Sequence, residues 1–150
     1  MATRAWICIK DDHKDLWKCV YCHFDGFPSH TGRLLLSTYN TRKKIEDLQS
    51  HGSIFDLYGK IDPDPKLPHS GKDPQKDVTI FYGRDMGRDM AEVSPFFFTQ
   101  YPDIFSSAYR AGYSPDFIYI FQDGKWMYSY LEGELGYDTD LRDLTYDTKD

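Results

Sequence analysis

Residues 21–32 read Tyr-Cys-His-Phe-Asp-Gly-Phe-Pro-Ser-His-Thr-Gly and gather side chains that could do chemistry. Imidazole and carboxylate groups exchange protons and bind ligands, while glycine and proline favour a sharp turn. A strand-like run precedes this stretch and a helix-like run follows it, and a helix N-terminus offers unpaired N–H groups to anions. We therefore expect a ligand-binding site here, whose candidate residues are His23, Asp25, His30 and Arg33. The alternative is that Asp25 and Ser29 only stabilise the turn.

A second polar cluster follows a predicted strand and repeats Gly-Arg-Asp-Met twice over residues 83–90. Two Arg-Asp pairs in a glycine-rich turn suit phosphate or carboxylate binding, because arginine forks hold such groups with two hydrogen bonds. The alternative is a pair of solvated ion pairs that contribute little. The sequence is neither a Walker A motif nor a dinucleotide fingerprint. The candidate ligand residues are Tyr82, Arg84, Asp85 and Arg88.

We expect the two clusters to form one anion-accepting pocket at the end of a sheet. Both predicted strands stop in glycine-containing turns that carry cationic or imidazole side chains. In that arrangement Arg84 and the backbone amides of residues 29–32 converge on one anionic group, with His23 or His30 beside it.

The three cysteines are weaker candidates. Cys19-Val-Tyr-Cys22-His23 matches the attachment pattern of c-type haem, but no export leader begins the sequence. A zinc site is disfavoured because a strand turns Cys19 and Cys22 to opposite faces and no second ligand pair follows. A Cys22 nucleophile would need His30 or His69 as its base. We expect reduced, buried thiols, no metal and no cofactor.

Composition limits the class of protein. The 150 residues fit one domain with a core. Residues 132–150 hold seven acidic and two basic residues, a net charge of −5 out of −6, so the body is almost neutral, which argues against general nucleic-acid binding. No apolar run is long enough to span a membrane, and no charged-then-apolar leader begins the sequence. Both observations predict a cytoplasmic protein without a membrane partner. We expect one domain over residues 1–133 and a frayed acidic tail over residues 134–150.

Hydrophobic periodicity predicts the elements of the fold. Ser29 is expected to cap a first helix and Thr41 a second, which ends near Gly52. A short helical turn at 95–100, a helix at about 103–111 and a long loop at 62–76 are also expected. Asp123-Gly124 is a strong hairpin signal. The five predicted strands span residues 3–10, 16–24, 77–82, 117–121 and 126–131.

These elements predict an α+β fold. We expect an antiparallel sheet of about five strands, with two to four helices packed mainly on one face.

The sequence resembles an uncharacterised family of small proteins from bacteriophages, prophages and bacteria. That family usually shows Tyr-Cys-His-Trp-Asp-Gly-Tyr-Pro at the first motif, where this chain has Phe24 and Phe27 in place of Trp and Tyr. The resemblance covers most of residues 3–130 and leaves the acidic tail outside. It is carried by Thr3-Arg4, the whole of 21–32, Leu34-Leu35, Tyr39-Asn40, residues 82–85 and the 117–126 hairpin.

The resemblance indicates the biological context in which the protein acts more than it indicates a chemical reaction. It suggests a small protein of a mobile element that acts against host defence, as a non-enzymatic binder or inhibitor of a nucleotide-like signal or a defence protein. The alternative is a small hydrolase or transferase for a nucleotide or other phosphate-containing substrate, using His23, Asp25 and His30.

Overall fold

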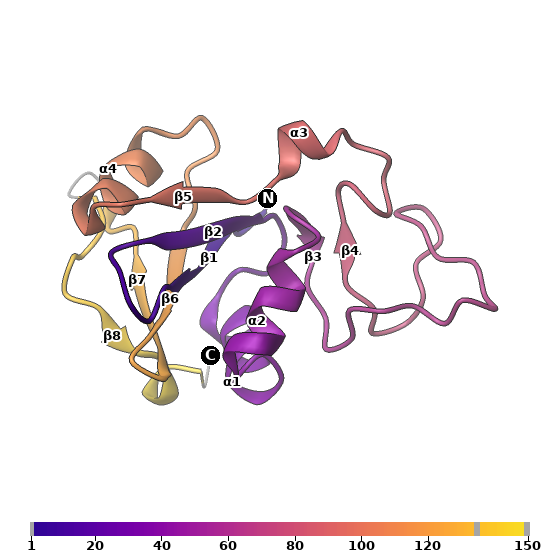
Figure 1. The fold of residues 1–150 in the computed structure, drawn as a ribbon, viewed down its shortest axis with the longest axis horizontal. Helices are drawn as coiled ribbons and strands as arrows, with labels where there is room; N and C mark the ends of the chain where they lie inside the picture. The colour runs from indigo at the N-terminus through magenta and orange to yellow at the C-terminus, as the bar shows by residue number, and fades with distance from the viewer. Residues whose placement is uncertain (1, 134–135, 149–150) are drawn as a thin grey trace.

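The computed structural model describes residues 2–133 and 136–148, which form a mixed sheet with helices on both sides (Figure 1). The strands follow the spatial order β4-β3-β2-β1-β6-β7-β8, and β5 pairs with β2 beside this path. The strands are β1 Ala5–Lys10, β2 Trp17–Cys22, β3 Ile54–Asp56, β4 Ile80–Phe81, β5 Phe96–Phe98, β6 Phe117–Gln122, β7 Lys125–Tyr130 and β8 Arg142–Asp143. The helical elements are η1 Pro28–Gly32, α1 Arg33–Ser37, α2 Arg42–Gln49, α3 Met90–Val93, α4 Tyr101–Arg110 and η3 Leu144–Tyr146.

The middle of the sheet is formed by β1, whose residues Ala5–Ile9 are all buried. A strand covered on both faces reads as a continuous apolar run, as this one does. It pairs antiparallel with β2 and parallel with β6, and β2 also pairs parallel with β3. The α+β class is therefore confirmed, but the prediction of about five purely antiparallel strands is wrong. The strand β4 lies within the predicted strand at 77–82, but β3, β5 and β8 were not predicted, because two or three residues are too few to show a period of two.

Two hydrophobic clusters cover the two faces of the sheet. One joins α1 and α2 to the sheet through Leu35, Ile45 and Leu48. The other joins α4 through Ile104 and Phe105, and Figure 1 shows α4 and α2 on opposite sides of the β1–β2 pair. The expectation of helices mainly on one face is therefore wrong. β1 and β6 have apolar residues on both faces, so helices pack against each face.

Two local signals are confirmed. Asp123 and Gly124 have φ values of 53° and 78°, as the type I′ turn between β6 and β7 requires. Thr41 caps α2 by accepting from the Lys44 N–H at 3.3 Å. Gly52 follows α2 with a φ of 78°, and a Cβ there would lie 2.3 Å from the Val93 carbonyl oxygen.

Residues 95–102 correct a prediction. Phe96–Phe98 is not a helical turn but the strand β5, which pairs antiparallel with residues 17–19 of β2. Pro102 does not interrupt a helix, because it lies in the first turn of α4, where a missing N–H costs nothing.

The acidic segment packs against the body in its described part. Leu144 is fully buried in the cluster under α1 and α2, and β8 pairs with β7. The Arg33 Nε also donates to the Thr148 carbonyl oxygen at 2.6 Å. The expected fraying therefore does not hold for residues 136–148, while positions 134–135 and 149–150 lie outside the described residues.

None of the described helices has both the length and the apolar character needed to span a bilayer.

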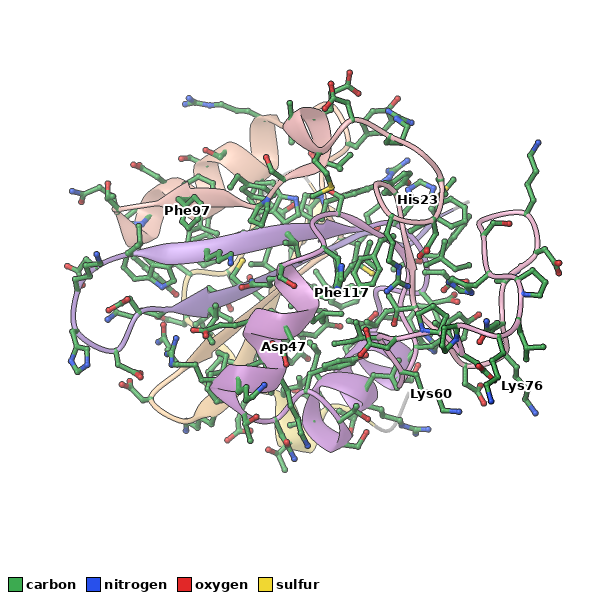
Figure 2. The ribbon with its side chains drawn as sticks, turned by 45° about the vertical axis from the view of Figure 1, so that its right-hand side comes forward. His23, Asp47, Lys60, Lys76, Phe97 and Phe117 are labelled. Atoms are coloured by element: carbon green, nitrogen blue, oxygen red, sulfur yellow. The ribbon has the colours of Figure 1, made fainter. Side chains whose placement is uncertain are left out.

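A loop from Leu57 to Thr79 projects from the side of β4 (Figure 1). Its two ends meet where Lys60 N–H donates to the Asp77 carbonyl oxygen at 3.1 Å, and Figure 2 labels Lys60 and Lys76 at this side of the molecule. The Gln75 side chain holds the loop together through hydrogen bonds to Asp64, Leu67 and Pro68. The long loop that the sequence predicts is therefore internally bonded.

Candidate functional site

The end of β2 positions the first motif against β3. The His23 N–H donates to the Ile54 carbonyl oxygen at 2.9 Å, and the Phe24 N–H to the Phe55 carbonyl oxygen at 3.2 Å. Because side chains alternate along a strand, Tyr21 and His23 point to the face that β5 and α4 cover. Cys22 points to the face that α1 and α2 cover.

A cavity of about 490 Å³ opens on the β5 side of this strand end. We call it the aromatic pocket, because four aromatic rings and an imidazole line it. Its volume falls within the range of roughly 300–1,000 Å³ that small-molecule sites occupy. The lining residues are Tyr21, His23, Ser53, Tyr82, Arg88, Glu92, Val93, Ser94, Phe96 and Tyr113.

The rings of the first and second motifs touch in this pocket. Tyr21 stacks on Tyr82 with centroids 6.4 Å apart and planes 29° apart. His23 stacks on Phe55 at 5.7 Å and 15°, and its Nδ1 lies 2.6 Å from the Tyr21 hydroxyl. Figure 2 shows His23 beside the turn that leads from β4 towards α3. His23 of the first motif and Tyr82 and Arg88 of the second motif line this one pocket, and their role in binding a ligand stays a prediction.

Three ring groups of the pocket, Tyr21, His23 and Tyr82, have pKa values that favour their uncharged forms at neutral pH. Partial burial, and then the charge of Arg4, lower the pKa of His23 below its usual range. Burial raises the pKa of Tyr82 to about 12 and also raises the pKa of Tyr21. The phenols therefore keep their protons and can donate hydrogen bonds to a ligand.

Arg88 supplies positive charge to the pocket. Its guanidinium lies 5.8 Å from the Tyr82 ring centre, and its Nη2 is 3.9 Å from the Glu92 carboxylate. The Arg88 side chain is 57% exposed, so solvent screens this pair and it contributes little to stability. Across the pocket, the guanidinium of Arg4 lies 5.3 Å from the ring centre of Tyr113.

Arg84 and Asp85, also predicted as ligand residues, do not line the aromatic pocket. Arg84 donates to both Asp85 carboxylate oxygens at 2.8 and 3.1 Å, to the Ile61 carbonyl oxygen at 2.8 Å and to the Thr79 carbonyl oxygen at 3.0 Å. Asp85 also accepts from the Phe81 N–H at 2.8 Å. These contacts hold the projecting loop to β4, so the expected role of Arg84 in anion binding is not supported.

The turn after β2 uses most of its amides in backbone hydrogen bonds. The N–H groups of His30 and Gly32 donate to the Phe27 carbonyl oxygen, at 3.1 and 3.5 Å, and the Thr31 N–H donates to the Asp25 carbonyl oxygen at 3.3 Å. Phe27, not Ser29, is the N-cap of the helical turn, and no side chain caps it. Three of the four amides at residues 29–32 are therefore bonded to carbonyl oxygens that precede or cap the turn, and the predicted convergence of all four on an anion is not supported.

Asp25 and His30 lie apart from the aromatic pocket and meet Asp56 of β3 instead. One ligand atom from each of the three side chains lies within 4.8 Å of the other two. Burial raises the pKa of Asp56, and the charge of Asp25 adds to this. The remaining candidate, Arg33, lies on α1 and bonds the C-terminal segment.

Sequence reasoning missed several residues of these two sites. Ser53, Glu92, Phe96 and Tyr113 reach the pocket from three separate segments, and Asp56 is a single acid in a three-residue strand. No spacing rule joins them to residues 21–32. The apolar run 96–98 was visible, but its pairing with β2 was not.

The cysteines are buried and free. Cys19 and Cys22 belong to the clusters on opposite faces of the sheet, as the strand placement predicted. Burial raises the pKa of Cys22 to about 12, so its thiol is protonated at neutral pH and is a poor nucleophile.

No family model, curated protein or solved structure matches this chain.

Proposed function

We propose that this chain is a non-enzymatic binding protein that holds a nucleotide-like small molecule in the aromatic pocket. The observation that supports this most directly is the lining, which combines four aromatic rings with one exposed arginine. A flat base gains by stacking on tyrosine or phenylalanine, and an arginine fork binds phosphate.

The orientation of such a ligand follows from the charges. The phosphate binds the Arg88 guanidinium. It displaces the Glu92 carboxylate, which is the exposed ion-pair partner of Arg88. The base lies against Tyr82 and Tyr113. The neutral His23, whose Nδ1 is engaged by Tyr21, turns Nε2 to the ligand.

The proposed setting is counter-defence in a host cell, as the phage resemblance suggests, with the bound molecule a nucleotide-like signal. A host defence protein is the other proposed partner. It would contact the exposed rings of Phe97 and Tyr113, which are 56% and 70% exposed.

The hydrolase or transferase alternative places His23 as the base in the same pocket. Its pKa is lowered, so the neutral form needed to accept a proton is present at neutral pH. Asp25 and His30, its other proposed residues, lie outside the pocket lining.

Calorimetric titration with mono-, di- and cyclic nucleotides tests the proposal. Arg88→Ala should weaken binding by about 1.5–3 kcal/mol, a tenfold to hundredfold loss, because a hydrogen bond to a charged group is removed. Tyr82→Ala should cost about 1–3 kcal/mol through lost stacking. Arg33→Ala is the matched control, since this arginine is exposed on α1 and outside the pocket, and it should bind like wild type.

Chromatography of the nucleotide after incubation separates binding from catalysis. Recovery of the unchanged nucleotide supports a binder, whereas turnover that His23→Ala abolishes supports the enzyme alternative. If no nucleotide binds, or if Arg33→Ala and Arg88→Ala behave alike, the pocket is not the nucleotide site and a protein partner becomes the better proposal.

A further inference from the structure

A second group of side chains with ligand chemistry lies across the sheet from the aromatic pocket. The strand β3 has a β-bulge or similar irregularity between Ile54 and Asp56, where it pairs with β4. Ile54 belongs to the cluster that α1 and α2 cover, while Phe55 stacks on His23. Next along β3, the Asp56 carboxylate lies beside the turn of the first motif, where it meets Asp25 and His30.

The spacing of these three groups suits one metal ion. Their ligand atoms lie within 4.8 Å of one another. Nitrogen and oxygen ligands about 2.0–2.2 Å from a tetrahedral zinc ion are about 3.3–3.6 Å apart, so the three ligand atoms need to approach one another by no more than about 1.5 Å, a movement that side-chain rotation supplies.

His30 is held in a tautomer that leaves one ring nitrogen free to bind a metal. Its Nε2 lies 2.9 Å from the Leu57 carbonyl oxygen. A carbonyl can only accept, so Nε2 carries the hydrogen and Nδ1 of the neutral ring keeps a free lone pair. Metal-binding histidines commonly donate their other ring N–H to a carbonyl or carboxylate in this way.

Asp56 contributes the second, independent observation. Its Oδ2 accepts from the Tyr58 hydroxyl at 3.0 Å. Its Oδ1 is buried and has no hydrogen-bond partner among the described residues. A buried carboxylate oxygen without a partner is costly, and a cation held between Asp56, Asp25 and His30 would satisfy it.

The backbone around Asp25 is fixed before any ion binds. Asp25 has a φ of 54°, and its carbonyl oxygen accepts from the Thr31 hydroxyl at 2.8 Å. The next carbonyl, of Gly26, accepts from the buried Tyr119 hydroxyl at 2.6 Å. A Cβ on Gly26 would lie 2.8 Å from the Thr3 carbonyl oxygen. A metal site needs this kind of rigid support.

We propose that Asp25, His30 and Asp56 bind one divalent first-row transition metal ion, such as Zn²⁺ or Mn²⁺. Two carboxylates and a neutral imidazole carry two negative charges, which a dication neutralises. The imidazole favours a transition metal over Mg²⁺ or Ca²⁺, which prefer oxygen ligands alone. Three protein ligands leave at least one coordination position for water or a phosphate oxygen.

The test uses the full chain, stripped with chelator and dialysed. Titration calorimetry with Zn²⁺, and electron paramagnetic resonance of added Mn²⁺, should each report one saturable site for the wild type. His30→Gln and Asp56→Asn should each weaken binding more than tenfold, and Tyr58→Phe about tenfold through its contact with Asp56. His13→Gln is the matched control, because His13 is exposed in the β1–β2 turn, and it should bind as the wild type does.

Folding of the variants is checked by their melting temperatures in chelator. Asp56→Asn should melt at or above the wild-type temperature there, because it removes repulsion with Asp25. Asp25→Asn should also fold, since asparagine tolerates a positive φ, and should lose the metal. Added Zn²⁺ should raise the melting temperature of the wild type alone among these three proteins.

Two results would overturn the proposal. One is that the wild type binds Zn²⁺ and Mn²⁺ at no saturable site, or binds them more weakly than it binds Mg²⁺. The other is equal affinity in wild type, His30→Gln and Asp56→Asn, which would place the metal elsewhere. Nucleotide binding in the aromatic pocket is measured separately, so it can fail or succeed independently of this site.

Discussion

Residues 83–86 and 87–90 have the same sequence, Gly-Arg-Asp-Met, but the fold uses them in opposite ways. In the first copy the Asp85 side chain is 3% exposed and Arg84 24%, and both are bonded to protein atoms. In the second copy Arg88 is 57% exposed and lines the aromatic pocket. Asp89 caps α3.

The neighbours explain the difference. Arg84 and Asp85 lie where the projecting loop returns to β4, so the Ile61 and Thr79 carbonyl oxygens and the Phe81 N–H are within their reach. His69 Nε2 also lies 3.4 Å from the Asp85 carboxylate. Gly87, with a φ of 73° and open space around it, then turns the chain away. A partly buried arginine whose Nε, Nη1 and Nη2 all donate to protein atoms is not available to a ligand.

The largest expected effect is that of Asp85→Ala. It removes the acceptor of Arg84 and of the Phe81 N–H in a buried position and leaves a partly buried cation unpaired. The free energy of unfolding should fall by about 3–5 kcal/mol, measured by urea denaturation. A loss below about 1 kcal/mol would mean that the first copy is as solvated as the second.

Lowering the pH should weaken the stabilising contacts of Asp85 in the first copy, residues 83–86. Burial alone would raise the pKa of Asp85, but the hydrogen bonds from Arg84 and the Phe81 N–H outweigh it and hold the pKa below its usual range. A lowered folded-state pKa means that the stabilisation is complete above about pH 4, the usual pKa of a free aspartate, and is lost as the pH falls through the folded-state value.

Asp85→Asn gives the measurement for this pH dependence. The difference in unfolding free energy between wild type and Asp85→Asn should be constant from pH 7 to about pH 5 and should shrink below about pH 4. Exposed carboxylates titrate in both proteins, so their contributions cancel in this difference. A difference that grows on acidification would contradict the lowered pKa.

The smallest expected effect is that of Asp89→Ala in the second copy. Its carboxylate accepts from the Ala91 N–H at 3.0 Å and caps a helix of four residues. Loss of an N-cap costs about 0.5–2 kcal/mol, and the low end applies because α3 is short and mostly exposed. Urea denaturation of Asp89→Ala and Asp85→Ala under the same conditions measures both losses of unfolding free energy. Equal losses would refute the expected ranking.

Local sequence determined the parts of this fold that depend on neighbours along the chain. The Asp123-Gly124 turn, the Thr41 cap of α2 and the opposite faces of Cys19 and Cys22 all follow from rules of a few residues. The same rules located the polar stretches that contain His23, Tyr82 and Arg88. They did not distinguish Arg88 from Arg84, because the two tetrapeptides are identical.

Tertiary structure alone decided the rest. The parallel pairing of β1 with β6 joins segments over a hundred residues apart, and it buries both faces of β1. The return of the projecting loop made Arg84 structural, and the placing of β3 beside residues 23–24 brought Asp56 to Asp25 and His30. Such contacts depend on which surfaces meet when the whole core forms, and no periodicity or spacing in the sequence records them.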